Sequence, residues 1–190
     1  MQSTVVGSFD PNCVLAYPAR NGNPKDGGDI LLYEDKTIVY QIFFQNTGNA
    51  PADRVIVRDP LDGNLDVSTI RNIRASHNMT VSAESDNKVL IFKFDNISLP
   101  DSTTDYAGSI GSIQYEIDLK PGAPIGTKIE KEVGIFFDFN EPVITNQNVL
   151  EIVSATRTSQ PSENALQLFP NPTDAAFGFF SDTASQLKIY

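Results

Sequence analysis

The stretch "IQYEIDLK", residues 113–120, gives the clearest indication of the fold class, because apolar and polar residues alternate along its whole length. Every second residue, beginning with Ile113, is apolar, and the residues between them are polar or charged. Successive side chains of a β-strand point to opposite faces of its sheet, so this pattern is typical of a strand with one face in water. Residues 37–45 repeat the pattern, and "QNTGNAP" then ends that segment with turn-forming residues.

A period of two dominates the rest of the chain, and no long window has the apolar spacing of an amphipathic helix. The sequence therefore predicts an all-β fold, an immunoglobulin-like antiparallel β-sandwich of about seven strands. Turn segments such as "DPLDGN" and "KPGAPIG" separate the strands. Further strands are predicted at residues 28–33, 54–59, 79–84, 88–94, 128–139 and 147–155.

The chain is acidic, with 14 Lys and Arg residues against 24 Asp and Glu residues among its 190 residues. Such a surface repels phosphate backbones and anionic lipids, so we expect no nucleic acid partner and no binding to membrane surfaces. Cations, or neutral polymers such as surface glycans, are more suitable partners for an acidic surface. We also expect no membrane span, because no apolar run is long enough to cross a bilayer.

The cysteine and histidine content argues against catalysis. A single cysteine, Cys13, excludes an intrachain disulfide and a cysteine-rich zinc site, and we expect its side chain to be buried or half-buried. The single histidine, His77, lies in "RASHNMT", and the chain has neither a nucleophile elbow nor a Gly-rich oxyanion loop. We therefore expect a structural or exposed histidine and no enzyme.

The C-terminal part of the chain changes in composition. The polar stretch "SATRTSQPSEN" predicts a linker, which we place at residues 157–165, between a sandwich at residues 1–156 and a second unit at residues 166–190. The second unit contains "LFPNPT", an apolar strand at residues 177–180 and "QLKIY". It resembles the beginning of the C-terminal sorting domain read by the type IX secretion system of Gram-negative bacteria. The sorting motif comprises Phe169, Pro170, Asn171, Pro172 and Thr173.

This resemblance implies export by the type IX secretion machinery to a secreted or outer cell-surface location. The Asp-Gly turn and the final strands of that sorting domain are absent from this sequence, so we expect a truncated second β unit. We expect the whole chain to be a fragment of a longer protein.

The first 150 residues or so also resemble a known module. The matches, in chain order, are "GSFDPN" (7–12), "YQIFFQNTGNAPADRVIVRDPLDGNLD" (40–66), "ASH" (75–77), "FDNISLPDS" (94–102) and "FFDFNEPVITN" (136–146). They resemble the repeat-type immunoglobulin-like domain of large bacterial surface proteins, which mostly serves as a spacer or stalk. We therefore expect a non-catalytic spacer or presentation module whose partners include the upstream domains of its parent protein.

Four polar residues form the candidate metal site, namely Asp10, Asn12, Asp138 and Asn140. If residues 128–139 form one strand that continues through 140, Asp138 and Asn140 share a face opposite Phe137 and Phe139. Calcium takes about six to eight oxygen ligands, so carbonyls and water would have to complete the site. Where the resembling family carries a second acidic residue, this chain has Cys13.

Two interpretations of these residues stay open. A calcium site would favour a calcium-dependent adhesin or carbohydrate-binding module over a plain spacer. Alternatively, the four side chains cap turns and form hydrogen bonds at strand ends. No cofactor other than calcium is expected.

Overall fold

The computed structural model describes residues 11–21, 28–32, 34–84, 86 and 88–154. The chain divides after Ala155 into two units, and every described residue belongs to the first. The predicted linker at 157–165, the sorting unit at 166–190 with its Phe169–Thr173 motif, and Asp10 lie outside the described residues.

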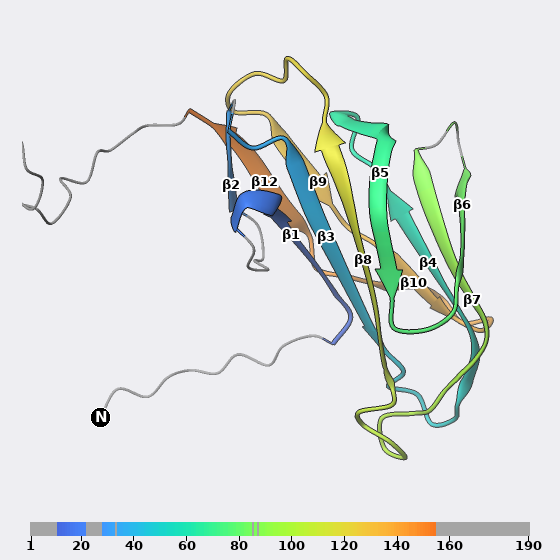
Figure 1. The fold of residues 1–190 in the computed structure, drawn as a ribbon. Helices are drawn as coiled ribbons and strands as arrows, with labels where there is room; N and C mark the ends of the chain where they lie inside the picture. The colour runs from blue at the N-terminus through green and yellow to red at the C-terminus, as the bar shows by residue number, and fades with distance from the viewer. Residues whose placement is uncertain (1–10, 22–27, 33, 85, 87, 155–190) are drawn as a thin grey trace, which may run out of the picture. The chain divides into compact units, whose positions relative to one another are not determined.

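The described residues form twelve β-strands and one short 3-10 turn, with no α-helix among them, which confirms the all-β prediction. Figure 1 shows how the strands stack. In chain order they are β1 (Cys13–Pro18), η1 (Ala19–Asn21), β2 (Gly28–Leu31), β3 (Thr37–Gln45), β4 (Ala52–Pro60), β5 (Leu65–Ala75), β6 (Thr80–Glu84), β7 (Val89–Leu99), β8 (Ile110–Leu119), β9 (Lys128–Lys131), β10 (Gly134–Phe137), β11 (Val143–Ile144) and β12 (Asn148–Val153).

The strands assemble into three sheets with the orders β1-β3-β8-β5, β11-β10-β4-β7-β6 and β2-β12-β9. The sheet that contains β3 and β8 lies over the sheet that contains β4 and β7, as Figure 1 shows. Neighbouring strands are antiparallel except β2 and β12, which are parallel. The predicted immunoglobulin-like sandwich is confirmed, with more strands than expected and one parallel pair.

The core lies between the two larger sheets and follows the predicted alternation. In β8, the inward residues Ile113, Tyr115 and Ile117 are at most 1% exposed. Aromatic rings meet across the layers, since Phe44 of β3 lies 5.3 Å from Phe94 of β7 and Tyr115 lies 5.8 Å from Phe92, between ring centroids. These contacts hold the two layers together and place the polar strand ends at the rims.

The prediction of one strand at residues 128–139 is wrong, because the segment forms β9 and β10 in different sheets. At the crossing, the backbone of Val133 pairs with Thr145, whose Oγ1 accepts a hydrogen bond from Val133 N at 3.1 Å. Ile129, Val133 and Ile135 are all buried, so the period of two continues through the crossing. Alternation alone therefore cannot reveal where the chain changes sheets.

Three strands were absent from the sequence prediction, namely β1, β5 and β11. Strand β1 is buried at five of its six positions and so lacks a polar face. In β5, register shifts between Asp66 and Arg71 and between Arg71 and Arg74 interrupt the alternation. A bulge places two residues opposite one, which breaks the period that reveals a strand in the sequence. Strand β11 has only two residues.

Candidate functional site

Asn12, the first residue of the candidate metal site that the structure describes, is 5% exposed. Its Oδ1 accepts a hydrogen bond of 3.0 Å from the backbone N–H of Gln45, the last residue of β3. This contact satisfies a buried donor at the end of a strand, because a backbone N–H without a partner is costly away from water. Asn12 therefore has a structural role at the rim of the sandwich.

Asp138 has a similar role at the end of β10. Its Oδ1 accepts hydrogen bonds from the backbone N–H groups of Asp53, at 3.0 Å, and Arg54, at 2.8 Å. The backbone N–H of Asp138 donates to Arg54 O at 2.9 Å. The residue has a φ of 52°, in the left-handed region that Asp adopts more readily than most residues. Asp138 thus fastens the end of β10 to the start of β4.

The prediction that Asp138 and Asn140 share one face of a strand, opposite Phe137 and Phe139, is wrong, because β10 ends at Phe137. Phe137 is 9% exposed whereas Phe139 is 94% exposed, so Phe139 does not belong to the core. The guanidinium of Arg54 lies 5.1 Å from the centroid of the Phe139 ring, a cation–π contact on the surface. Asn140 is exposed, and its backbone N–H donates to Phe137 O at 3.1 Å.

The calcium site stays a prediction, because Asp10 lies outside the described residues. In the part of the chain that the structure describes, no group of three or more His, Cys, Asp or Glu side chains is arranged to hold a metal ion. Asn12 and Asp138 make the strand-end hydrogen bonds that the alternative interpretation expects.

A second polar cluster, which the sequence did not predict, lies inside the core. The side chain of Lys131, the last residue of β9, is 1% exposed, and the side chain of Asp59 in β4 is 0% exposed. Lys131 Nζ meets Asp59 Oδ1 as an ion pair. The sequence does contain a sign of this pair. Asp59 lies two residues after the inward-facing Val57, and Lys131 lies two residues after the inward-facing Ile129, so the alternation points both charged side chains into the core.

Two tyrosines enclose this ion pair. Lys131 Nζ donates to the hydroxyl of Tyr115 at 2.8 Å, and that hydroxyl donates to Asp59 Oδ2 at 2.6 Å. Lys131 Nζ also donates to Pro60 O at 3.2 Å and lies 4.4 Å from the centroid of the Tyr40 ring. The hydroxyl of Tyr40 is buried and has no hydrogen-bond partner among the described residues. The side chains of Lys131 and Asp59 are therefore almost completely buried, and the members of the cluster bond chiefly to one another.

Burial controls the ionisation of this cluster. Desolvation raises the pKa of Asp59 and lowers the pKa of Lys131, although the attraction between the two groups opposes both shifts. Desolvation also raises the pKa of Tyr115 well above its ordinary value, and the charge of Asp59 adds to this effect. The interior thus favours the neutral forms of amine, carboxylic acid and phenol, because a charge loses its hydration there.

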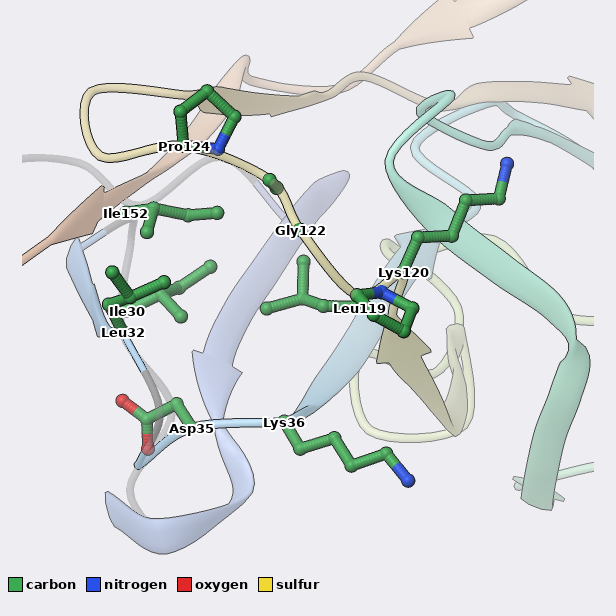
Figure 2. A pocket seen from close by; sticks show the side chains of 11 residues that line it. Ile30, Leu32, Asp35, Lys36, Leu119, Lys120, Gly122, Pro124 and Ile152 are labelled. Carbon is green, nitrogen blue, oxygen red and sulfur yellow. The ribbon is translucent and has the colours of Figure 1, made fainter.

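Figure 2 shows an apolar groove of about 500 Å³ near one end of the sandwich. The side chains of Ile30, Ile152 and Leu119 line it, and the segment from Lys120 to Pro124 borders it. Asp35 also borders the groove, but its carboxylate is engaged by Arg20, whose Nε lies 2.7 Å from Asp35 Oδ1. The groove therefore offers apolar surface rather than reactive groups.

Cys13 and His77 have the structural settings that the sequence predicts. Cys13 is buried, with 4% of its surface exposed. His77 is half-buried, and its Nδ1 lies 2.8 Å from Ser76 Oγ. Ser76 Oγ in turn accepts a hydrogen bond of 2.9 Å from Ser112 N, so this serine supports the junction of β5 and β8. In the described part of the chain, no helix has the length and apolar character needed to cross a membrane.

The chain belongs to the family described as domain of unknown function DUF7619, whose model matches residues 10–151. The match therefore includes both Asp59 and Lys131 as well as the strand-end residues Asn12 and Asp138. No curated protein matches the chain.

Solved structures with a similar fold come from bacterial surface proteins. The N-terminal domain of the Streptococcus gordonii adhesin Sgo0707 has a TM-score of 0.53 and 14% identity, covering 77% of this chain and 33% of that chain. BcpA, the major pilin subunit of Bacillus cereus, has a TM-score of 0.51 and 15% identity, covering 74% of this chain and 39% of that chain. Domains D2 and D3 of the major pilin SpaD from Corynebacterium diphtheriae have a TM-score of 0.50 and 17% identity, covering 73% of this chain and 51% of that chain. At such low identities the likeness establishes a shared fold.

Proposed function

We propose that this chain is a non-catalytic spacer or presentation module of a larger protein at the bacterial cell surface. The observation that carries the proposal is that the polar candidate residues form structural hydrogen bonds. Asn12 and Asp138 satisfy backbone groups at strand ends, and Ser76 supports a strand junction. The shared fold with adhesin and pilin domains supports a location at the surface.

The export route is the second part of this proposal, and it rests on the motif Phe169–Thr173. A test would place a reporter before residue 1 and add the final strands of a sorting domain after Tyr190, in a host with an active type IX secretion system. The reporter is expected on the cell surface or in the medium. A matched variant with alanines at 169–173 should retain it in the periplasm. Retention of both fusions in the periplasm would contradict the export route.

A calcium-dependent adhesin or carbohydrate-binding module is the second candidate function. One observation favours it, since no hydrogen bond engages Oδ2 of Asp138 among the described residues, which leaves that oxygen available to a cation. Calcium at about 100 times its dissociation constant would stabilise the fold by roughly 2.7 kcal/mol, or about 5–10 °C in the unfolding temperature.

The decisive comparison is thermal unfolding in EDTA and in millimolar calcium, for the natural chain and for Asn140→Ala. Asn140 is exposed, so this change removes a predicted ligand with little effect on packing. Asp138→Ala is less informative, because it also removes two hydrogen bonds to β4. A calcium-induced rise that Asn140→Ala reduces would favour the adhesin, and equal unfolding temperatures would favour the spacer.

A further inference from the structure

The Lys131–Asp59 contact places a primary amine against a carboxyl group in the buried core. Lys131 comes from β9 and Asp59 from β4, and both side chains are almost completely buried. We propose that Lys131 Nζ and the carboxyl group of Asp59 condense into an intramolecular amide bond, with the release of one water molecule. This inference goes beyond the proposed function and does not depend on the export route.

The fold supplies the two conditions that this reaction needs. First, it holds the reacting groups together, and well-oriented intramolecular groups reach effective concentrations on the order of 10⁵–10⁸ M. Second, it buries both groups, and desolvation raises the pKa of Asp59 and lowers the pKa of Lys131, so both shift towards their neutral forms. A desolvated lysine is a competent nucleophile because its nitrogen lone pair is free in the neutral form.

Tyr115 is placed to move a proton between the two groups. Its hydroxyl accepts a hydrogen bond from Lys131 Nζ at 2.8 Å and donates one to Asp59 Oδ2 at 2.6 Å. A proton that leaves the nitrogen can therefore pass to Tyr115 while the tyrosine passes its own proton to Oδ2. Tyr115 is unchanged at the end of this exchange.

The reaction balances without an external reagent. The ammonium first gives one proton to Asp59 Oδ1, and the amine lone pair then forms a bond to Cγ. The relay through Tyr115 carries a second proton from nitrogen to Oδ2. One of the two hydroxyl groups on Cγ then takes the proton of the other and leaves as water, so the carbonyl is restored. The nitrogen keeps one proton, and no atom is oxidised or reduced.

The product suits the site better than the ion pair does. Condensation removes two charges from the core, where each charge lacks hydration. The single N–H of the amide keeps an acceptor in Pro60 O, which lies 3.2 Å from Nζ. The Tyr115 hydroxyl can still donate to the amide oxygen, so the polar groups of the product have partners.

The bond would have a mechanical consequence. It would close a covalent ring that contains residues 60–130 and would join β4 directly to β9. A force applied at the two ends of the chain would then bypass these residues. In single-molecule stretching, the gain in contour length on unfolding should be shorter by roughly 250 Å than in a variant without the bond, at about 3.3–3.6 Å per residue.

The mass of the purified full-length chain under denaturing conditions tests the proposal directly. The expected mass is lower than the sequence mass by one water molecule. Trypsin does not cleave after an acylated lysine, so the digest should contain residues 59–71 joined to residues 129–157. Lys131→Met and Asp59→Ala should each have the full sequence mass, with no joined peptide.

Two results would overturn the proposal. A natural chain at full sequence mass after prolonged incubation in the folded state would show that Lys131 and Asp59 form only an ion pair. Loss of water without the joined peptide would place the dehydration elsewhere, for example as a succinimide at Asp62, which precedes Gly63. Both results can be recognised whether or not the export and spacer proposals hold.

Discussion

At the scale of single residues, Tyr40 and Tyr115 show how the same buried hydroxyl can have opposite effects. Both residues are 0% exposed, and their rings lie 5.4 Å apart between centroids. Tyr115 bonds to both Lys131 and Asp59, whereas the Tyr40 hydroxyl has no partner among the described residues. A buried polar group without a partner is destabilising, and one that satisfies a charged group is stabilising.

The two Tyr→Phe variants should therefore differ. Tyr115→Phe removes a partner from Asp59 and Lys131 and should lower the free energy of unfolding by about 1–3 kcal/mol. Tyr40→Phe keeps the ring and removes a hydroxyl without a partner, so stability should be unchanged or slightly higher. Urea unfolding of the two variants checks this, and equal losses in both would contradict the assigned roles.

Asp101 gives a prediction about acid stability. Hydrogen bonds from the side chains of Thr103 and Thr104 lower the pKa of Asp101 to about 2. A carboxyl whose pKa is lower in the folded state stabilises the fold above its unfolded pKa, and this contribution is lost as the pH falls through the folded value. The free energy of unfolding should thus decrease between about pH 4 and pH 2.

Asp101→Asn is the matched control for this prediction, because it keeps an acceptor oxygen and cannot titrate. Denaturant unfolding at several pH values should show a weaker pH dependence in this variant over the same acid range. An identical pH dependence in both proteins would mean that other carboxyl groups account for the acid sensitivity.

At the scale of elements, the pairing of β3 and β8 depends on a glycine. Gly111 of β8 lies opposite Phe44 of β3, and a Cβ at this position would overlap the Phe44 ring. That ring is 0% exposed and packs against Phe94 and Phe137, so it has little room to move. Added volume in a close-packed core forces strained side chains and shifts of the backbone.

Gly111→Ala should therefore lower the free energy of unfolding by about 1–3 kcal/mol. Gly63→Ala serves as the control, because no neighbouring atom lies within 4 Å of the added Cβ. Thermal unfolding of both variants provides the measurement. Equal unfolding temperatures for the two variants would show that the β3–β8 pair adjusts without cost.

At the scale of the whole molecule, Asp59 and Lys131 connect strands from different sheets. Lys131→Met prevents the proposed amide bond and also leaves Asp59 buried without its counterpart, which costs about 3–5 kcal/mol for a buried ion pair. Lys131→Met should show such a loss. The double variant Lys131→Met with Asp59→Leu should be more stable than Lys131→Met alone, because it leaves no charge in the core.

Urea unfolding of the two single variants and the double variant measures this coupling. If the loss in free energy of unfolding of the double variant equals the sum of the losses of the single variants, the two side chains act independently, and the core does not depend on their contact. A double variant that unfolds at a higher urea concentration than Lys131→Met would confirm that the loss of stability in Lys131→Met comes from leaving Asp59 without its partner.

Particular residues show how far the sequence could predict this structure. The alternation from Ile113 onwards predicts β8, and the same pattern from Thr37 predicts β3 with its bounds. Strand β1 escaped prediction because both of its faces are covered, and β5 because register shifts break its period. Asn12 and Asp138 could be singled out as polar residues at strand ends, but their partners at Gln45 and Arg54 could not be predicted.

The amino-acid pattern alone is sufficient for the all-β class, for most strands and for the inward positions of the core, because these follow from neighbours two residues apart. Tertiary structure decided the change of sheet between β9 and β10, the left-handed backbone at Asp138 and the meeting of Lys131 with Asp59. Each of these depends on contacts between residues far apart in the chain, and a local period carries no information about such contacts.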